Sequence, residues 1–178
     1  GSLIKPAIYL TALQKPDRYT LASLLEDSPL YISTANQETW SPQNYDKEFK
    51  GNIPLFHALR DSRNVPSVRL GLELGLEDIA ETLKNLGVKR KLPTYPSMTL
   101  GAFDLSPMDI ANMYQTFAAG GFHVPLKVIR EVLTNDDQPL KRYPLESTQT
   151  LDEKPVYLTN YVMHQVTQSG TARYLNKT

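Results

Sequence analysis

The sequence contains no cysteine, and this absence excludes a disulfide framework, a thiolate metal site and a cysteine nucleophile. It also lacks net charge, because 19 lysine and arginine residues balance 19 aspartate and glutamate residues. Charge therefore favours neither nucleic acid nor an anionic membrane as a partner. No apolar run approaches the ~20 residues of a membrane-spanning helix, and we expect no signal peptide in these residues. We expect no nucleic-acid partner and no membrane segment in this chain.

Side chains that bind metals or phosphates are equally scarce. The three histidines, His57, His123 and His164, are not spaced as metal ligands with one another or with carboxylates. No glycine-rich loop of the phosphate-binding type is present. The sequence therefore predicts no metal and no cofactor.

The length of 178 residues predicts a single domain, residues 1–178, with a sizeable core. Thirteen scattered prolines favour short elements, and no repeat or linker divides the chain. A chain that opens on Gly1-Ser2 without a leader is expected to be a piece of a longer protein. The same dipeptide is also a common remnant of an expression tag, and that alternative gives Ser2 no function.

The first residues place a hydroxyl and an amine on one face of a helix. Ser2 and Lys5 are three residues apart at the start of an apolar segment, so their side chains can meet across one turn. Pro6 places the helix start between Ser2 and Lys5, because proline has no N–H and crowds a preceding turn. A serine activated by a neighbouring lysine is one form of nucleophilic catalysis. The spacing alone also arises by chance.

Hydrophobic spacing and capping signals predict the remaining elements. The segment 7–13 is apolar all round, as in a buried helix, and a short helix is expected at 21–25. Residues 27–51 are expected to be loop with brief strands. Further helices are expected at 54–61, 67–74, 76–86 and 106–120, and a last one at 155–168 with Leu158, Tyr161, Val162 and Val166 inward. A β-hairpin is expected from strands at 128–133 and 140–143.

Ser62 and Asn64 are predicted to lie in a tight connection between two of these helices. Short polar side chains in such a connection point outward from a fixed backbone and are available for function. The alternative is that both residues only cap the flanking helices.

Ser-x-x-Lys followed by Ser-x-Asn is the motif order of penicillin-binding proteins and serine β-lactamases. Longer segments, in the same order, resemble the transpeptidase domain of bifunctional class A penicillin-binding proteins across nearly the whole chain. These segments are Gly1-Ser-Leu-Ile-Lys-Pro, Trp40-Ser-Pro-Gln-Asn-Tyr-Asp, Ser62-Arg-Asn-Val-Pro, Leu100-Gly-Ala-Phe-Asp-Leu-Ser-Pro-Met-Asp-Ile-Ala, Phe117-Ala-Ala-Gly-Gly and Ser169-Gly-Thr-Ala.

The resemblance implies a serine-type D-Ala-D-Ala transpeptidase. Ser2 is then the nucleophile, and Lys5 is the general base, with a pKa lowered by its surroundings. Ser62 passes the proton to the leaving group, and Asn64 holds the substrate amide. The implied partners are peptidoglycan stem peptides and β-lactam antibiotics. Arg63 stands where β-lactamases have aspartate, which argues against hydrolytic resistance activity.

The chain departs from the family pattern in one respect. The third family motif, Lys-Thr-Gly on a strand that contributes to the oxyanion hole, is absent from these 178 residues. The expected fold is therefore α/β (α+β), the helix-rich part of the transpeptidase fold, with a small hairpin and an incomplete main sheet. We expect such a fragment to be inactive alone. The rest of the parent transpeptidase and glycosyltransferase chain would anchor it at the periplasmic face of the bacterial inner membrane.

Two alternatives come from other classes of function. A β-lactam-sensing domain shares the motifs but uses acylation as a signal, and the segments around Trp40 and Leu100 argue against it. A non-catalytic helical module would use Ser2, Lys5, Ser62 and Asn64 only to cap helices. It predicts that Ser2 and Lys5 point away from Ser62.

Overall fold

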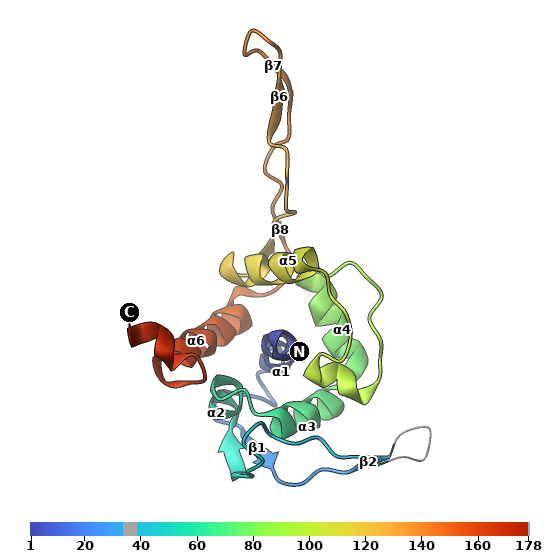
Figure 1. The fold of residues 1–178 in the computed structure, drawn as a ribbon, viewed down its shortest axis with the longest axis vertical. Helices are drawn as coiled ribbons and strands as arrows, with labels where there is room; N and C mark the ends of the chain where they lie inside the picture. The colour runs from blue at the N-terminus through green and yellow to red at the C-terminus, as the bar shows by residue number, and fades with distance from the viewer. Residues whose placement is uncertain (34–38, 178) are drawn as a thin grey trace.

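The computed structural model describes residues 1–33 and 39–177, which fold as helices packed around a central helix. That helix, α1 (Lys5–Leu13), follows the 3-10 turn η1 (Ser2–Ile4), and every one of its nine residues is buried. Figure 1 views α1 end-on, with α2 to α6 arranged around it. Because α1 is apolar on all sides, a ring of helices is the arrangement that removes its whole surface from water.

The surrounding helices begin and end at local sequence signals. Helix α5 begins with a capping box, in which the Asp109 N–H and the Ser106 hydroxyl oxygen lie 3.1 Å apart. Acidic Glu77 and Asp78 occupy the first turn of α4, near the positive end of its dipole. The bounds are α2 (Leu55–Arg60), α3 (Asn64–Leu74), α4 (Leu76–Asn85), η2 (Pro96–Leu100), α5 (Pro107–Ala118), α6 (Glu153–Ser169) and η3 (Arg173–Lys177).

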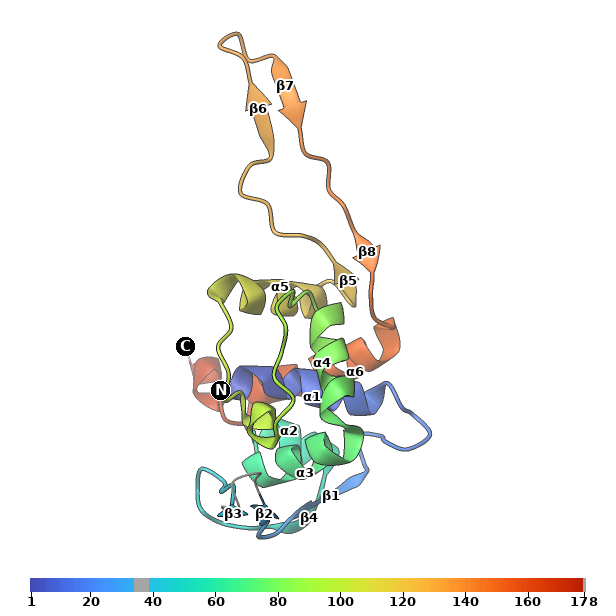
Figure 2. The ribbon, with the colours of Figure 1, turned by 90° about the vertical axis from the view of Figure 1, so that its right-hand side faces the viewer.

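The strands of the described residues form four antiparallel pairs and no larger sheet. They pair as β1 (Leu24–Asp27) with β4 (Gly51–Pro54), β2 (Ile32–Ser33) with β3 (Thr39–Trp40), β5 (Phe122–His123) with β8 (Thr148–Gln149), and β6 (Glu131–Leu133) with β7 (Pro139–Arg142). The first pair lies beside α3, at the opposite end of the molecule from the last (Figure 2). The α/β fold with an incomplete main sheet is therefore confirmed.

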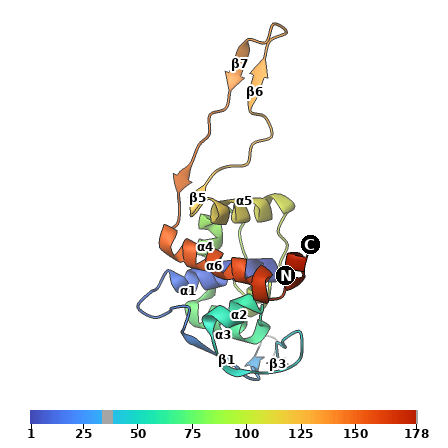
Figure 3. The ribbon, with the colours of Figure 1, turned by 90° about the vertical axis from the view of Figure 1, so that its left-hand side faces the viewer.

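The predicted hairpin forms an arm that extends away from the helices (Figure 3). All residues of β6 and β7 are exposed, and the arm is attached through the short pair β5 and β8. Val128 and Ile129 were expected in its first strand, but that strand begins at Glu131, and both side chains are exposed.

Three further local predictions are wrong. Residues 21–25 form a turn and the start of β1 rather than a helix, because Leu24 to Asp27 pair with β4. Helix α3 begins at Asn64, so Asn64 belongs to its first turn and not to the connection. Tyr161 is 46% exposed, and its ring lies against Phe56 at the surface of α6. Among the described residues, no helix is both long and apolar enough to cross a membrane.

Candidate active site

Lys5 connects the central helix with the turn between α2 and α3. Its side chain is 2% exposed, and its Nζ atom lies 2.6 Å from the carbonyl oxygen of Ser62, 3.0 Å from Ser62 Oγ and 2.6 Å from Asn64 Oδ1. An ammonium group has three N–H donors, and these three acceptors use all of them. Lys5, Ser62 and Asn64, singled out from the sequence, thus lie together in space.

The surroundings of Lys5 change its basicity. Burial, and secondarily the positive charge of Arg63, lower the pKa of the Lys5 amine from its ordinary value to about 8. Both effects act against the charged form of the amine. The direction of the shift is the one that the resemblance implied, and roughly a tenth of an amine with this pKa is neutral at pH 7.

Ser62 adopts a backbone conformation that is unusual for its residue type. Its φ angle is +51°, in the left-handed region that costs a residue with a Cβ about 1–2 kcal/mol. Neither Ser62 nor Asn64 caps α3, because the N-cap residue is Arg63 and no side chain of the cap makes the capping bond. The prediction that these residues only cap helices is therefore wrong for α3.

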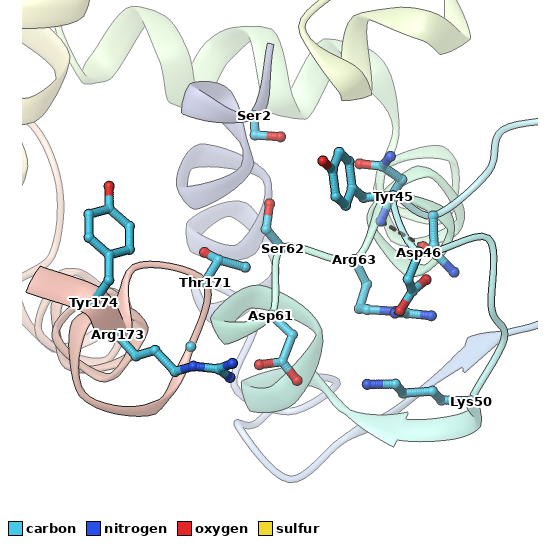
Figure 4. A pocket seen from close by; sticks show the side chains of 13 residues that line it. Ser2, Tyr45, Asp46, Lys50, Asp61, Ser62, Arg63, Thr171, Arg173 and Tyr174 are labelled. Carbon is cyan, nitrogen blue, oxygen red and sulfur yellow. Dashed lines mark hydrogen bonds and ion pairs between the residues drawn. The ribbon is translucent and has the colours of Figure 1, made fainter.

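Ser2 lies above this turn, on the same cleft as Ser62. The cleft has a volume of about 840 Å³, and Figure 4 shows the Ser62 hydroxyl directed toward Ser2. Within the described residues, the Ser2 side chain makes no hydrogen bond to Lys5, whose three donors are occupied elsewhere. The predicted pair of Ser2 and Lys5 is therefore not joined by a hydrogen bond in this structure. The cleft also contains Asn44, Tyr45, Asp46, Lys50, Asp61, Arg63, Asn64, Gly170, Thr171, Arg173 and Tyr174.

A second, more apolar cleft of about 390 Å³ adjoins the first at Ser2, Ser62 and Thr171. Lys5 contributes to this cleft, together with the apolar residues Leu3, Pro6, Leu59, Met163 and Val166 and with Tyr114. Ser2 therefore lies at the boundary between a more polar and a more apolar cleft. A non-catalytic module predicted that Lys5 points away from Ser62, and the 3.0 Å contact contradicts this.

Two contacts from α5 and η2 hold the segment that carries Ser2. The hydroxyl of Tyr114 donates to the carbonyl oxygen of Leu3 at 2.9 Å. On the other side, the Gly1 nitrogen donates to the carbonyl oxygen of Gly101 at 2.7 Å. Gly101 has a φ of +69°, and a Cβ there would lie 2.2 Å from the Gly1 nitrogen. Only glycine fits this close approach.

The sequence did not predict a buried polar cluster that lies beneath Ser62 and Asn64. The carboxylate of Asp27, at the end of β1, is fully buried and forms an ion pair with Arg63 at 2.8 Å. The Asn44 amide nitrogen donates to the other Asp27 oxygen at 2.7 Å. These residues are 17 to 36 positions apart in the chain. No local pattern reveals such a pairing, although Asn44 and Arg63 both fall within segments that resemble the family.

The sequence of this chain matches one protein family. All of residues 1–178 match the family model described as penicillin binding protein transpeptidase domain. The chain is 45% identical to penicillin-binding protein 1B of Vibrio cholerae over 177 residues, 99% of this chain and 23% of that protein. It is 42% identical to penicillin-binding protein 1B of Escherichia coli strain K12 over 178 residues, 98% of this chain and 21% of that protein. The chain thus spans less than a quarter of the length of these relatives.

Solved structures show the same fold. Penicillin-binding protein 1A of Haemophilus influenzae matches with a TM-score of 0.92 and 24% identity, over 99% of this chain and 32% of that chain. Penicillin-binding protein A of Mycobacterium tuberculosis, solved as a penicillin G acyl-enzyme complex, matches with a TM-score of 0.79 and 17% identity, over 94% of this chain and 43% of that chain. The geometry around Lys5, the family model and these likenesses agree, and the chain belongs to the penicillin-binding protein transpeptidase domain family.

Proposed function

We propose that this chain carries the acylation machinery of a peptidoglycan DD-transpeptidase, with Ser2 as the nucleophile. The observation that carries the proposal is the buried Lys5 amine, with its lowered pKa, held by Ser62 and Asn64, where Lys5 and Ser2 both line the more apolar cleft. A deprotonated amine beside a serine hydroxyl is the requirement for serine attack on a carbonyl. The Mycobacterium tuberculosis neighbour forms an acyl-enzyme with penicillin G, which supports the same chemistry here.

Lys5 can act as a base only after it loses a proton. While protonated, Lys5 uses all three N–H groups on Ser62 and Asn64 and has no lone pair for Ser2. Loss of one proton leaves two donors and one lone pair, which can accept the Ser2 proton. The Ser2 oxygen then bonds to the substrate carbonyl carbon. Collapse of the tetrahedral intermediate breaks the C–N bond and releases D-alanine.

Ser62 and Asn64 are assigned the next two roles. The Ser62 hydroxyl accepts from Lys5 and keeps its own proton for the leaving nitrogen, so it can relay a proton from Lys5. Asn64 fixes the amine through Oδ1 and holds the substrate amide. An amine of a second stem peptide then attacks the ester and takes the place of Ser2, which forms the cross-link.

We further infer that these 178 residues turn over slowly when alone. They contain no Lys-Thr-Gly segment, and no strand of the described residues runs beside Ser2. The Ser2 N–H is then half of an oxyanion hole, and loss of one donor costs roughly 10²–10³ in turnover. The proposal places the working site in a longer class A protein at the periplasmic face of the inner membrane. Its ligands there are stem peptides and β-lactams.

Intact-mass spectrometry after incubation with a labelled penicillin tests the proposal. We expect one adduct on a longer protein that contains this chain and a Lys-Thr-Gly segment, and none on its Ser2→Ala variant. The isolated chain should be labelled slowly or not at all. An unlabelled longer protein, or a labelled Ser2→Ala variant, would refute Ser2 as the nucleophile. A sensing domain would acylate but form no cross-link with an added amine acceptor.

A further inference from the structure

Asn44 occupies a central place beneath the candidate site, in the loop that follows β3. Its Oδ1 atom accepts from the backbone N–H groups of Asn64 at 2.9 Å and Val65 at 3.1 Å. Its Nδ2 atom donates to Asp27 Oδ1 at 2.7 Å and to the carbonyl oxygen of Glu48 at 2.9 Å. The side chain is 3% exposed. We propose that Asn44 is a positioning residue that holds the Ser62–Asn64 turn against Lys5.

The helix start needs this support from outside. The first N–H groups of a helix have no partner within it, and α3 has no capping side chain of its own. Asn44 satisfies two of these donors from 20 residues upstream in the chain. It therefore performs the capping that the alternative interpretation assigned to Ser62 and Asn64. Those two side chains remain free for Lys5.

Asp27 fixes the orientation of the Asn44 side chain. One Asp27 oxygen accepts from Asn44, while the other accepts from Arg63 Nε at 3.0 Å. Arg63 also donates to the Glu48 carbonyl at 2.6 Å and to Asp46 at 2.5 Å. The two oxygens of Asp27 thus join the loop that carries Asn44 to the turn that carries Arg63. An asparagine held in this way cannot rotate without breaking a bond to a buried charge.

The turn carries strain that these contacts must oppose. Ser62 is left-handed with φ +51°, and relaxation of that angle would redirect the chain at Asn64. Asn64 is held on its other side by a bond from Nδ2 to the Gln43 carbonyl at 2.8 Å. Its Oδ1 atom then faces Lys5 at 2.6 Å. Residues 43 and 44 together therefore set the direction of the Asn64 side chain.

Asn44 lines the cleft but is not equipped to bind substrate. Its oxygen already accepts two bonds and its amide group donates two, so its hydrogen-bonding capacity is used. Its effect on the reaction is therefore expected to act through Asn64 and Ser62. This inference rests on the proposed function for its kinetic consequence, and on the hydrogen bonds alone for its structural one.

The test uses a full-length protein that contains this chain. We expect Asn44→Ala and Asn44→Asp to slow acylation by labelled penicillin about 10²-fold, the order that misplacement of about 1 Å costs. The aspartate keeps the acceptors for α3 but places a second carboxylate against Asp27. The double variant Asp27→Asn/Asn44→Asp restores an amide opposite a carboxylate, but it removes the buried partner of Arg63 and the donor to Glu48, so it should recover only part of the rate. If Asn44→Ala does not fold, the comparison of Asn44→Asp with the double variant tests the proposal.

Asn160→Ala is the matched control, because Asn160 also donates an amide N–H to a backbone carbonyl, that of Phe117 at 2.7 Å, away from the cleft. It should lower the melting temperature without slowing acylation. Amide hydrogen exchange at Asn64 and Val65 should accelerate in Asn44→Ala and not in Asn160→Ala. Folded Asn44 variants with normal acylation and exchange would overturn the inference. A wild-type protein that penicillin does not acylate would instead refute the proposed function and leave the exchange result to decide the inference.

Discussion

Arg63 and Asp27 form an ion pair of 2.8 Å in which both side chains are buried, with 5% and 0% of their surface exposed. The pair joins the end of β1 to the turn that carries Ser62 and Asn64. Removing two charges from water is costly, and an isolated buried charge costs still more. The stability of the turn therefore depends on both partners being present.

Asp27→Asn should lower the free energy of unfolding by up to about 3 kcal/mol, because it leaves the partly exposed Asp46 as the carboxylate partner of the buried Arg63 guanidinium. Chemical denaturation measures this loss. The control is Glu131→Gln, which breaks the exposed pair with Arg142 on the arm and should cost less than about 1 kcal/mol. Equal losses for the two variants would contradict the role of burial.

The lowered pKa of Lys5 predicts a pH dependence of stability. The amine has a pKa of about 8 when folded and an ordinary value of 10.5 when unfolded. Between these values the unfolded chain binds more protons, so stability rises with pH by up to about 1.4 kcal/mol per unit. Thermal unfolding from pH 7.5 to 9.5 should show the rise. Above that range the raised pKa of Tyr19, about 12, opposes it, because the unfolded tyrosine ionises first.

Lys5→Met isolates this contribution, because every other titrating group is retained. The difference in melting temperature between the original chain and Lys5→Met should change steadily in favour of the original chain as pH rises from 7.5 to 9.5. A difference that does not vary with pH would mean that folding does not lower the pKa of Lys5.

Gly101→Ala should displace the segment that carries Ser2. The new Cβ would lie 2.2 Å from the Gly1 nitrogen, so η2 or the first residues must move. Gly120→Ala is a close control: its φ of +67° nearly equals the +69° of Gly101, but nothing lies within 4 Å of a Cβ there. In both variants the free energy of unfolding should fall by about 1–2 kcal/mol, the cost of a left-handed residue that has a Cβ. Only Gly101→Ala should also slow acylation, as measured with labelled penicillin.

The arm should be dispensable for folding of the helices. The pair β5 and β8 brings Phe122 opposite Gln149, and the strands β6 and β7 bury no residue. Replacement of residues 125–147 by a short Gly-Ser linker should leave the melting temperature within a few degrees, since surface changes alter stability by about 0.5 kcal/mol. A large loss of stability would show that the arm packs on the helices in solution.

The elements that were predicted correctly have local signals. The capping box at Ser106 predicted α5, and the acidic first turn with Gly87 predicted α4. The segment 21–25 was wrong because its conformation depends on β4, about 30 residues later in the chain. Short strands that pair over such distances are determined by tertiary contacts more than by their own sequence.

The candidate site likewise contains residues that the sequence predicted and residues that it did not. The spacing of Ser2 and Lys5, and the motif at Ser62 and Asn64, predicted which side chains gather around the two adjoining clefts. Asp27 and Asn44, which lie beneath these side chains, come from two other segments, and no sequence spacing predicts that they pair. The left-handed φ of Ser62 is equally invisible in a sequence, because serine does not favour that conformation.

The central position of α1 also has a consequence for biosynthesis. This helix is translated before α3, α4 and α6, the helices against which it packs, and α6 comes last. Until then part of its apolar surface is uncovered and open to association with other nascent chains. Lys5 is thus made early but acquires its altered basicity late. A chaperone that covers residues 5–13 during translation would protect the part of the chain on which the chemistry depends.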